Sequence, residues 1–212
     1  NKFLYLPEKE IINSFTIIDT KNWLLSQFKD AAIEINIVGD IDVNKTTELV
    51  GVYFGSLPER QKLAPKPKLD LALKKPFSYS AEFKTKINTA MMFLMIPTVD
   101  FRQIEEVRQL NLLGKILDDK TLKLVREKLS ISYSPGAGHS FDQDFINFCH
   151  LQFVADVEPK NVGALQNAIE SIIKETYEKG ITSQDLEAVR KPTLNQIKDY
   201  IKTNEYWLDR VL

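Results

Sequence analysis

Cysteine and histidine are scarce in this sequence. The 212 residues include one cysteine, Cys149, so no disulfide can form within the chain. The two histidines, His139 and His150, are far apart for ligands on one element, and neither a His-x-x-x-His nor a Cys-x-x-Cys pair occurs. Because zinc sites need several closely arranged ligands, we expect no metal site held by this chain alone.

Long apolar runs and an excess of one charge are also missing. The longest apolar stretch, residues 90–97, is much shorter than the roughly 18 residues that span a bilayer. Lys and Arg total 28 and Asp and Glu total 29, which leaves a formal net charge of −1. The sequence therefore predicts no transmembrane segment and no basic footprint for nucleic acid.

Alternating and helical apolar patterns are present along the whole chain. Residues 31–38 alternate between isoleucine and other side chains, which predicts a half-buried strand. Residues 43–54 then predict a helix with Asn44 as its N-cap and Gly55 at its end. The apolar end of a later extended region, residues 91–96, suits a central strand.

The rest of the chain carries further elements. Leucines alternate over 69–73, and the extended region that ends in the apolar run begins at residue 79. Residues 101–129 predict a helix with a break at 118–120, and residues 131–135 predict a strand followed by a glycine-rich loop at 136–138. A further strand is predicted over 145–156, and then a helix that begins at Val162 and ends at Gly180. The final helix is capped by Thr182 or Ser183, and Pro192 is expected to kink or divide it.

The order of these elements predicts the fold class. Helices follow pairs of strands and do not alternate with single strands, which favours an α+β fold. We expect a two-layer sandwich with a mixed or antiparallel sheet of about five to six strands and helices packed on one face. We interpret residues 1–30 as a linker and leading helix, and residues 31–212 as a single domain excised from a longer, multi-domain parent.

A glycine-rich motif, Gly136-Ala137-Gly138, raises the possibility of a phosphate loop. Phosphate loops use the N–H groups of a helix that follows the glycines, and here a strand is expected to follow. The motif is therefore better interpreted as a hairpin loop.

Arg126 and Tyr133 form the one constellation with chemical promise. A helix end followed by a strand can bring both side chains to the same rim of a sheet. A guanidinium and a phenol both donate hydrogen bonds to a carbonyl or an oxyanion. From the residues alone, a structural role for this pair is the simpler interpretation.

Several stretches nevertheless resemble one family. Ile37–Asp42 and Tyr53–Pro58 resemble the C-terminal homology domain of the pitrilysin/insulinase family of zinc metallopeptidases. Further matching stretches are Val125–Leu129, Tyr133–Pro135, Ala137, Gly180–Thr182 and Asn204–Leu208. The last of these is similar to bacterial, largely periplasmic members, and the match covers nearly the whole chain from about Trp23.

The resemblance implies where the metal lies. Members of this family hold zinc in an N-terminal homology domain, on an inverted His-x-x-Glu-His helix, and this sequence has no such motif. The chain is thus similar to the half that does not bind zinc. It is expected to bind no cofactor itself, with the zinc in a partner domain of the parent chain or in a partner subunit.

The resemblance also implies a role for the candidate pair. In the insulin-degrading branch, a late domain supplies an Arg and a Tyr, seven positions apart, to the active site of the other half. Arg126 and Tyr133 match this pair in type and spacing, although the residues around the Tyr differ. Gly136 and Gly138 would lie in the following loop, either contacting peptide substrate or forming a hairpin loop without contact.

Two functions are compatible with the resemblance. The leading one is a substrate-binding, active-site-completing domain of a zinc-dependent metalloendopeptidase that cleaves peptides in an enclosed chamber and is inactive alone. The alternative is a non-catalytic scaffold or assembly subunit of the same family. We expect no nucleic-acid partner, and we favour the bacterial periplasm over the cytoplasm.

Overall fold

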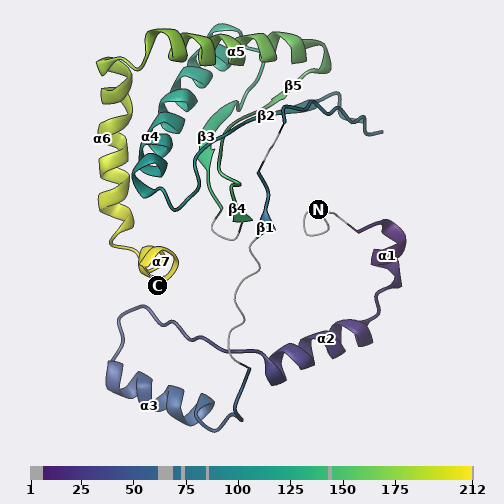
Figure 1. Cartoon of the computed structure of the whole chain (residues 1–212), viewed down its shortest axis with the longest axis vertical. Coiled ribbons are helices and arrows are strands. Elements are labelled where there is room, and N and C mark those ends of the chain that lie inside the picture. The colour runs from purple at the N-terminus through teal and green to yellow at the C-terminus, as the bar shows by residue number, and fades with distance from the viewer. Residues whose placement is uncertain (1–6, 62–68, 73–74, 85, 143–144, 212) are drawn as a thin grey trace. The chain divides into compact units, whose positions relative to one another are not determined.

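The contacts of the chain divide it into two units, each described here by itself. The structure is a computed structural model that describes residues 7–61, 69–72, 75–84, 86–142 and 145–211. The terminal unit comprises Asn1–Pro65 and Asp199–Leu212, and the central unit comprises Lys66–Lys198. Figure 1 shows the elements of both units.

The terminal unit is made of helices joined by extended segments. Its elements are α1 (Lys9–Ser14), α2 (Ile17–Asp30), α3 (Val43–Phe54), α7 (Asn204–Tyr206) and the π-helix η3 (Trp207–Val211). A capping box begins α2, because the Thr16 hydroxyl accepts from the Asp19 amide at 3.2 Å and the Asp19 carboxylate accepts from the Thr16 amide at 2.8 Å.

Helix α3 has the predicted bounds but a different cap. The Asp42 carboxylate accepts from the Lys45 amide at 3.0 Å, so Asp42 is the N-cap and the assignment of Asn44 is wrong. Asn44 is already the second helical residue, whereas a cap precedes the first helical residue and accepts from an amide two or three positions after itself.

The predicted strand at residues 31–38 is not formed. This segment is extended but pairs with no other strand among the described residues, and Ile33, Ile35 and Ile37 are exposed. The prediction of a half-buried strand is therefore wrong here, because a strand needs a neighbouring backbone for its hydrogen bonds as well as an alternating pattern.

The central unit is built on an antiparallel sheet. Its strands are β2 (Ala90–Pro97), β5 (His150–Val157) and β3 (Gly136–Ser140), in the order β2-β5-β3. The register places Phe93 opposite Val154 on one side of β5, and Ala137 opposite Phe153 on the other. A separate parallel pair joins β1 (Leu69–Asp70) to β4 (Phe145–Ile146).

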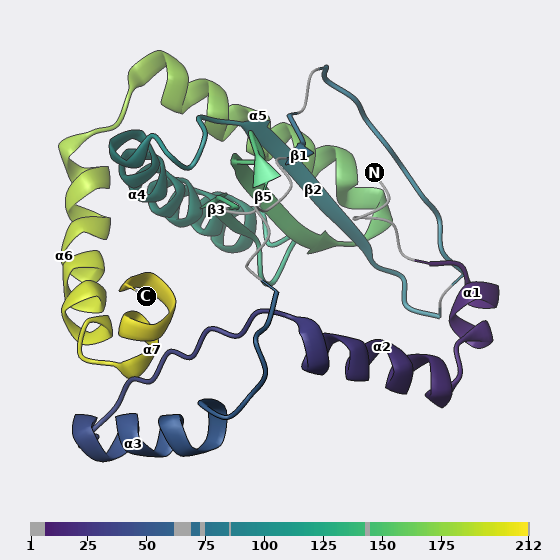
Figure 2. The same cartoon turned by 60° about the horizontal axis from the view of Figure 1, so that its bottom comes forward.

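Helices cover one face of this sheet (Figures 1 and 2). They are α4 (Ile104–Thr121), continued by the π-helix η1 (Leu122–Lys128), and α5 (Val162–Lys179), which follows the short 3-10 helix η2 (Pro159–Asn161). Phe153 of β5 and Leu165 and Ile169 of α5 are fully buried between the two layers. The α+β class with helices on one face is confirmed, whereas a sheet of five to six strands is not, because the described strands form two smaller sheets.

Among the strands that the structure describes, β2 lies at an edge of the three-stranded sheet, so its prediction as a central strand is wrong. Its side chains alternate between half-buried and exposed, and Met91, Phe93 and Met95 lie on the exposed side. The predicted extended region from residue 79 is a strand only from Ala90 onward. An apolar run alone does not tell whether a strand is covered on both faces.

The helix and glycine boundaries also differ from the prediction. No break occurs at 118–120, because α4 continues to Thr121 and then widens into η1. The strand lies over Gly136–Ser140 and the segment 131–135 is irregular, which reverses the predicted strand and loop. The strand predicted over 145–156 is interrupted at Asn147, whose φ of 60° is left-handed.

The end of the central unit follows the sequence signals closely. Gly180, with a φ of 73°, ends α5 as predicted. The Thr182 hydroxyl accepts from the Asp185 amide at 3.1 Å, which confirms Thr182 as the cap of α6 (Ser183–Tyr200). Pro192 lies inside α6 and does not divide it.

Candidate functional site

Arg126 lies on the π-helix η1, at the end of the long helical segment that begins with α4. The Leu129 amide donates to the Leu124 carbonyl at 3.0 Å, the wider spacing that defines a π turn. Val125 is fully buried and holds this turn against the core, while Arg126 is exposed beside it. π turns of this kind are frequent at functional sites because they re-aim a side chain.

The chain reverses direction directly after η1. Ser130 has a φ of 52°, a left-handed conformation that is uncommon for residues other than glycine. The Ile131 amide then donates to the Val125 carbonyl at 3.2 Å, which ties the returning segment to the helix. Ser132 is buried and Tyr133 is 79% exposed, so the segment presents the phenol to the surface.

The structure brings Arg126 and Tyr133 together. The guanidinium carbon of Arg126 lies 4.7 Å from the centre of the Tyr133 ring, which is a cation–π contact. The sequence predicted this proximity from a helix end and a strand, but the elements are a π-helix and an irregular segment. The role of the pair toward a substrate stays a prediction.

The contact between Arg126 and Tyr133 leaves the N–H donors of Arg126 available for a ligand. Among the residues that the structure describes, the Arg126 side chain has no ion-pair or hydrogen-bond partner, and its guanidinium carbon lies 4.7 Å from the centre of the Tyr133 ring. A guanidinium carries five N–H donors, and none of those of Arg126 is bonded to a described residue. Arg126 and the Tyr133 hydroxyl can therefore donate to one acceptor group, such as a peptide carbonyl or an oxyanion.

Gly136 and Gly138 lie in strand β3 and not in a loop. They pair with Val154 and Gln152 of β5. Packing does not require glycine at either position, because a Cβ added at Gly138 would meet no atom within 4 Å and one added at Gly136 would lie 3.6 Å from Asp118 Oδ1. The close approach of α4 to β3 is at Gly114, where an added Cβ would lie 2.6 Å from the His139 nitrogen and 3.0 Å from the Gly138 carbonyl carbon. Whether either glycine contacts substrate stays open.

His139 is bonded at both ring nitrogens. Its Nδ1 lies 2.9 Å from the Asn111 side-chain oxygen and its Nε2 lies 3.0 Å from the Thr98 hydroxyl. Burial lowers the pKa of His139 below its usual value, and the positive charge of His150 adds to this effect. The ring therefore serves as a neutral link between α4, β3 and the end of β2.

Asp100 is engaged in local contacts, and Cys149 lies in the core. Arg102 bonds the Asp100 carboxylate and, with the Asn147 amide at 3.1 Å, lowers the pKa of Asp100 to about 2. Cys149 is buried and unpaired. Within the part of the chain that the structure describes, no group of three or more His, Cys, Asp or Glu side chains is arranged to hold a metal ion.

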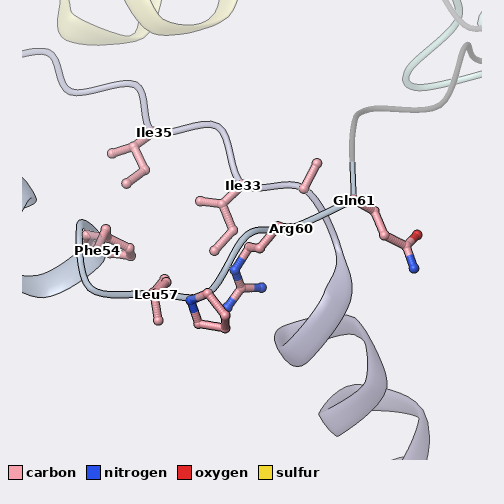
Figure 3. Close-up of a pocket in the computed structure, with 8 residues that line it drawn as sticks. Ile33, Ile35, Phe54, Leu57, Arg60 and Gln61 are labelled. Carbon is pink, nitrogen blue, oxygen red and sulfur yellow. The ribbon is translucent and has the colours of Figure 1, made fainter.

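One hollow in the terminal unit had no signal in the sequence patterns (Figure 3). It has a volume of about 380 Å³ and is lined mainly by apolar side chains, among them Ile33, Phe54 and Leu57. Arg60 crosses it and donates to the Phe28 and Ala31 carbonyls at 2.5 and 3.2 Å. These two bonds tie Arg60 to the carbonyls at the C-terminal end of α2.

Comparison with known proteins identifies a curated relative in sequence, and solved structures with a similar fold. The chain is 24% identical over 210 residues to a zinc protease PQQL-like protein of Arabidopsis thaliana, covering 88% of this chain and 21% of the relative. The chain therefore spans about a fifth of the length of that protein. None of the described helices is long and apolar enough to cross a membrane.

Three solved structures share the fold. The peptidase M16 inactive domain from Pseudomonas fluorescens superposes with a TM-score of 0.63 at 16% identity over 90% of this chain and 45% of its own. A conserved protein from Enterococcus faecalis gives 0.68 at 14% identity, over 93% and 46% of the two chains. The periplasmic protease PqqL from Escherichia coli gives 0.52 at 15% identity, over 79% and 19%.

A family model gives the assignment. The model described as the peptidase M16 inactive domain matches residues 14–192, which is most of the chain. This range includes α4, η1, α5 and the three-stranded sheet of the central unit, and the Arg126–Tyr133 pair. The chain belongs to the inactive-domain family of the M16 zinc peptidases.

Proposed function

We propose that this chain is the substrate-binding, active-site-completing domain of a zinc-dependent metalloendopeptidase, and that it is inactive alone. The contact of Arg126 with Tyr133 at 4.7 Å carries the proposal. Family membership supplies the context, because a domain without metal ligands can still bind and orient the peptide. In this proposal the peptide is held in an enclosed chamber formed with the rest of the protein.

The chemistry of the pair suits a developing negative charge. Cleavage of a peptide bond passes through a tetrahedral oxyanion, and donors that are already in place stabilise it without reorganisation. The stack and the Ile131–Val125 hydrogen bond restrict both donors before substrate arrives. Arg126 would neutralise charge and the Tyr133 hydroxyl would donate to the same or a neighbouring peptide oxygen.

The proposal assigns the metal to another domain. No described group of this chain fits a zinc ion, so the zinc would be bound by a homologous domain of the parent chain or of a partner subunit. Zinc in such enzymes polarises the scissile carbonyl and lowers the pKa of bound water. This chain would contribute peptide binding and the two donors from across the chamber.

The proposed compartment is the bacterial periplasm. Its support is the fold shared with PqqL from Escherichia coli, which is described as a periplasmic protease. The natural substrates in that case are peptides present in the periplasm.

The test uses the full-length protein that contains this chain. Hydrolysis of a quenched fluorescent peptide is measured with and without a zinc chelator, for the wild type, Arg126→Ala and Arg108→Ala. We expect chelator-sensitive cleavage that falls about a hundredfold in Arg126→Ala, the usual effect of removing one oxyanion donor. Arg108 is an exposed arginine of α4 bonded to Glu105, so Arg108→Ala is the matched control and should keep full activity.

Two results would contradict the proposal. Equal activity of Arg126→Ala and Arg108→Ala would remove Arg126 from the site. No cleavage by the wild-type full-length protein would favour a non-catalytic scaffold subunit of the same family.

A further inference from the structure

One face of α4 packs against strand β3 (Figure 2). Asn111, Gly114 and Asp118 are spaced three and four residues apart, so they lie on the same side of the helix. Asn111 bonds the His139 ring, and Gly114 touches the backbone at Gly138 and His139. Asp118 completes this contact at the beginning of the strand.

The Asp118 carboxylate bonds the backbone and not another side chain. Its Oδ1 accepts from the Ala137 amide at 2.8 Å. Ala137 is in register with Phe153 of β5, and the Asp118 bond provides a side-chain acceptor for its amide. The Asp118 side chain therefore accepts the hydrogen bond that a backbone carbonyl of a neighbouring strand accepts elsewhere in a sheet. This bond fixes the position where β3 starts.

This bond lies just beyond Tyr133. The Ile131 amide bonds the Val125 carbonyl before Tyr133, and the Ala137 amide bonds Asp118 after it. The short segment between these amides is thus anchored at both ends to the same continuous helix, α4 and η1, that carries Arg126. Fixing both ends limits where the Tyr133 ring can lie relative to Arg126.

We infer that Asp118 is a positioning residue for Tyr133, acting through the Ala137 amide to hold the Tyr133 ring on Arg126. This inference rests on the proposed function of the pair. Asp119, the next residue, has a different role, because it forms an exposed ion pair with Lys123 at 2.6 Å one turn along the helix. Of the two neighbouring carboxylates, only Asp118 bonds the Tyr133 segment.

The test is a double-mutant cycle in the full-length protein. Asp118→Ala is expected to lower kcat on the quenched peptide about tenfold, because small displacements of a transition-state donor have effects of this order. Asp118→Asn keeps a side-chain oxygen for the Ala137 amide and should retain most of the activity. In a Tyr133→Phe background, Asp118→Ala should have no further effect, since it acts through the Tyr133 hydroxyl.

Asp119→Ala is the matched control, since it removes a carboxylate from the same turn and should keep wild-type activity. Hydrogen exchange read by mass spectrometry gives a second measurement. Peptides covering residues 131–137 should exchange faster in Asp118→Ala than in the wild type, and Asp118→Asn and Asp119→Ala should match the wild type.

The outcomes separate this inference from the proposed function. If Tyr133→Phe lowers kcat and Asp118→Ala lowers it equally in both backgrounds, Asp118 does not act through Tyr133 and the inference is overturned. If Tyr133→Phe has full activity, the proposed function fails. The anchoring by Asp118 is then decided by exchange alone, and unchanged exchange in Asp118→Ala overturns it.

Discussion

His139 connects three elements through one ring, and its burial has a consequence for stability. The pKa of His139 is lowered in the folded chain, so as the pH falls below neutrality the unfolded chain binds more protons at this residue than the folded chain does. Stability should therefore decrease as pH falls through the usual histidine pKa, about 6.5, toward the lower folded value.

A comparison of the wild type with His139→Gln tests the expected direction of this pH dependence. Urea unfolding of the wild type at pH 7.5 and 5.5 should show a larger loss of stability than the same measurement on His139→Gln. His150 is present in both proteins, so its contribution largely cancels. An equal pH dependence in the two proteins would mean that burial of His139 does not shift its pKa.

Single residues of the site were predictable to different degrees. The types and spacing of Arg126 and Tyr133 were visible in the sequence, and so was the possibility of their meeting. The π-helical turn at Leu122–Lys128 and the left-handed Ser130 were not, because neither has a distinctive residue signal. The role of Asp118 was not visible either, because it depends on a tertiary hydrogen bond to the Ala137 amide.

At the scale of elements, α4 approaches strand β3 closely at Gly114. An added methyl at Gly114 would meet backbone atoms 2.6 and 3.0 Å away, which cannot move without separating helix and strand. We expect Gly114→Ala to lower the free energy of unfolding by about 1–3 kcal/mol, as overpacking usually does. The higher helix propensity of alanine offsets up to about 1 kcal/mol of this cost.

Gly163→Ala in α5 is the matched control for this prediction. No atom lies within 4 Å of a Cβ added at Gly163, so only the helix propensity changes. Urea unfolding should show Gly163→Ala to be as stable as the wild type or more so. Stabilisation by both substitutions would contradict the close approach at Gly114.

Elements were predicted best where local signals decide them. Gly180 and Thr182 were assigned correctly because chain reversal and capping are local. Strand assignment failed at residues 31–38 and at the position of β2 in the sheet, because pairing depends on distant backbone. Apolar alternation alone does not reveal which neighbour, if any, completes a strand.

At the scale of the whole molecule, the two units differ in how they bury side chains. The buried core belongs to the central unit, whereas no described residue of the terminal unit is buried. The candidate pair lies in the central unit, directly beside fully buried Val125. The arrangement of Arg126 and Tyr133 therefore rests on the well-packed part of the chain.

The α+β class and the family were predictable from the order of elements and from scattered matching stretches. The number of strands in one sheet was not, because it depends on pairing between distant segments. The family model over residues 14–192 agrees with the resemblance that the sequence suggested. The activity of the longer protein is a separate matter, since this chain spans about a fifth of its curated relative.

The most direct test of the proposed role of Tyr133 is a measurement of kcat for Tyr133→Phe in the full-length protein. Tyr177→Phe serves as control, since Tyr177 is an 89% exposed tyrosine of α5 with no part in the site. We predict that loss of the Tyr133 hydroxyl lowers kcat by about 10²–10³, as for other oxyanion donors, while Tyr177→Phe keeps wild-type turnover. Equal turnover of the two variants would contradict the account.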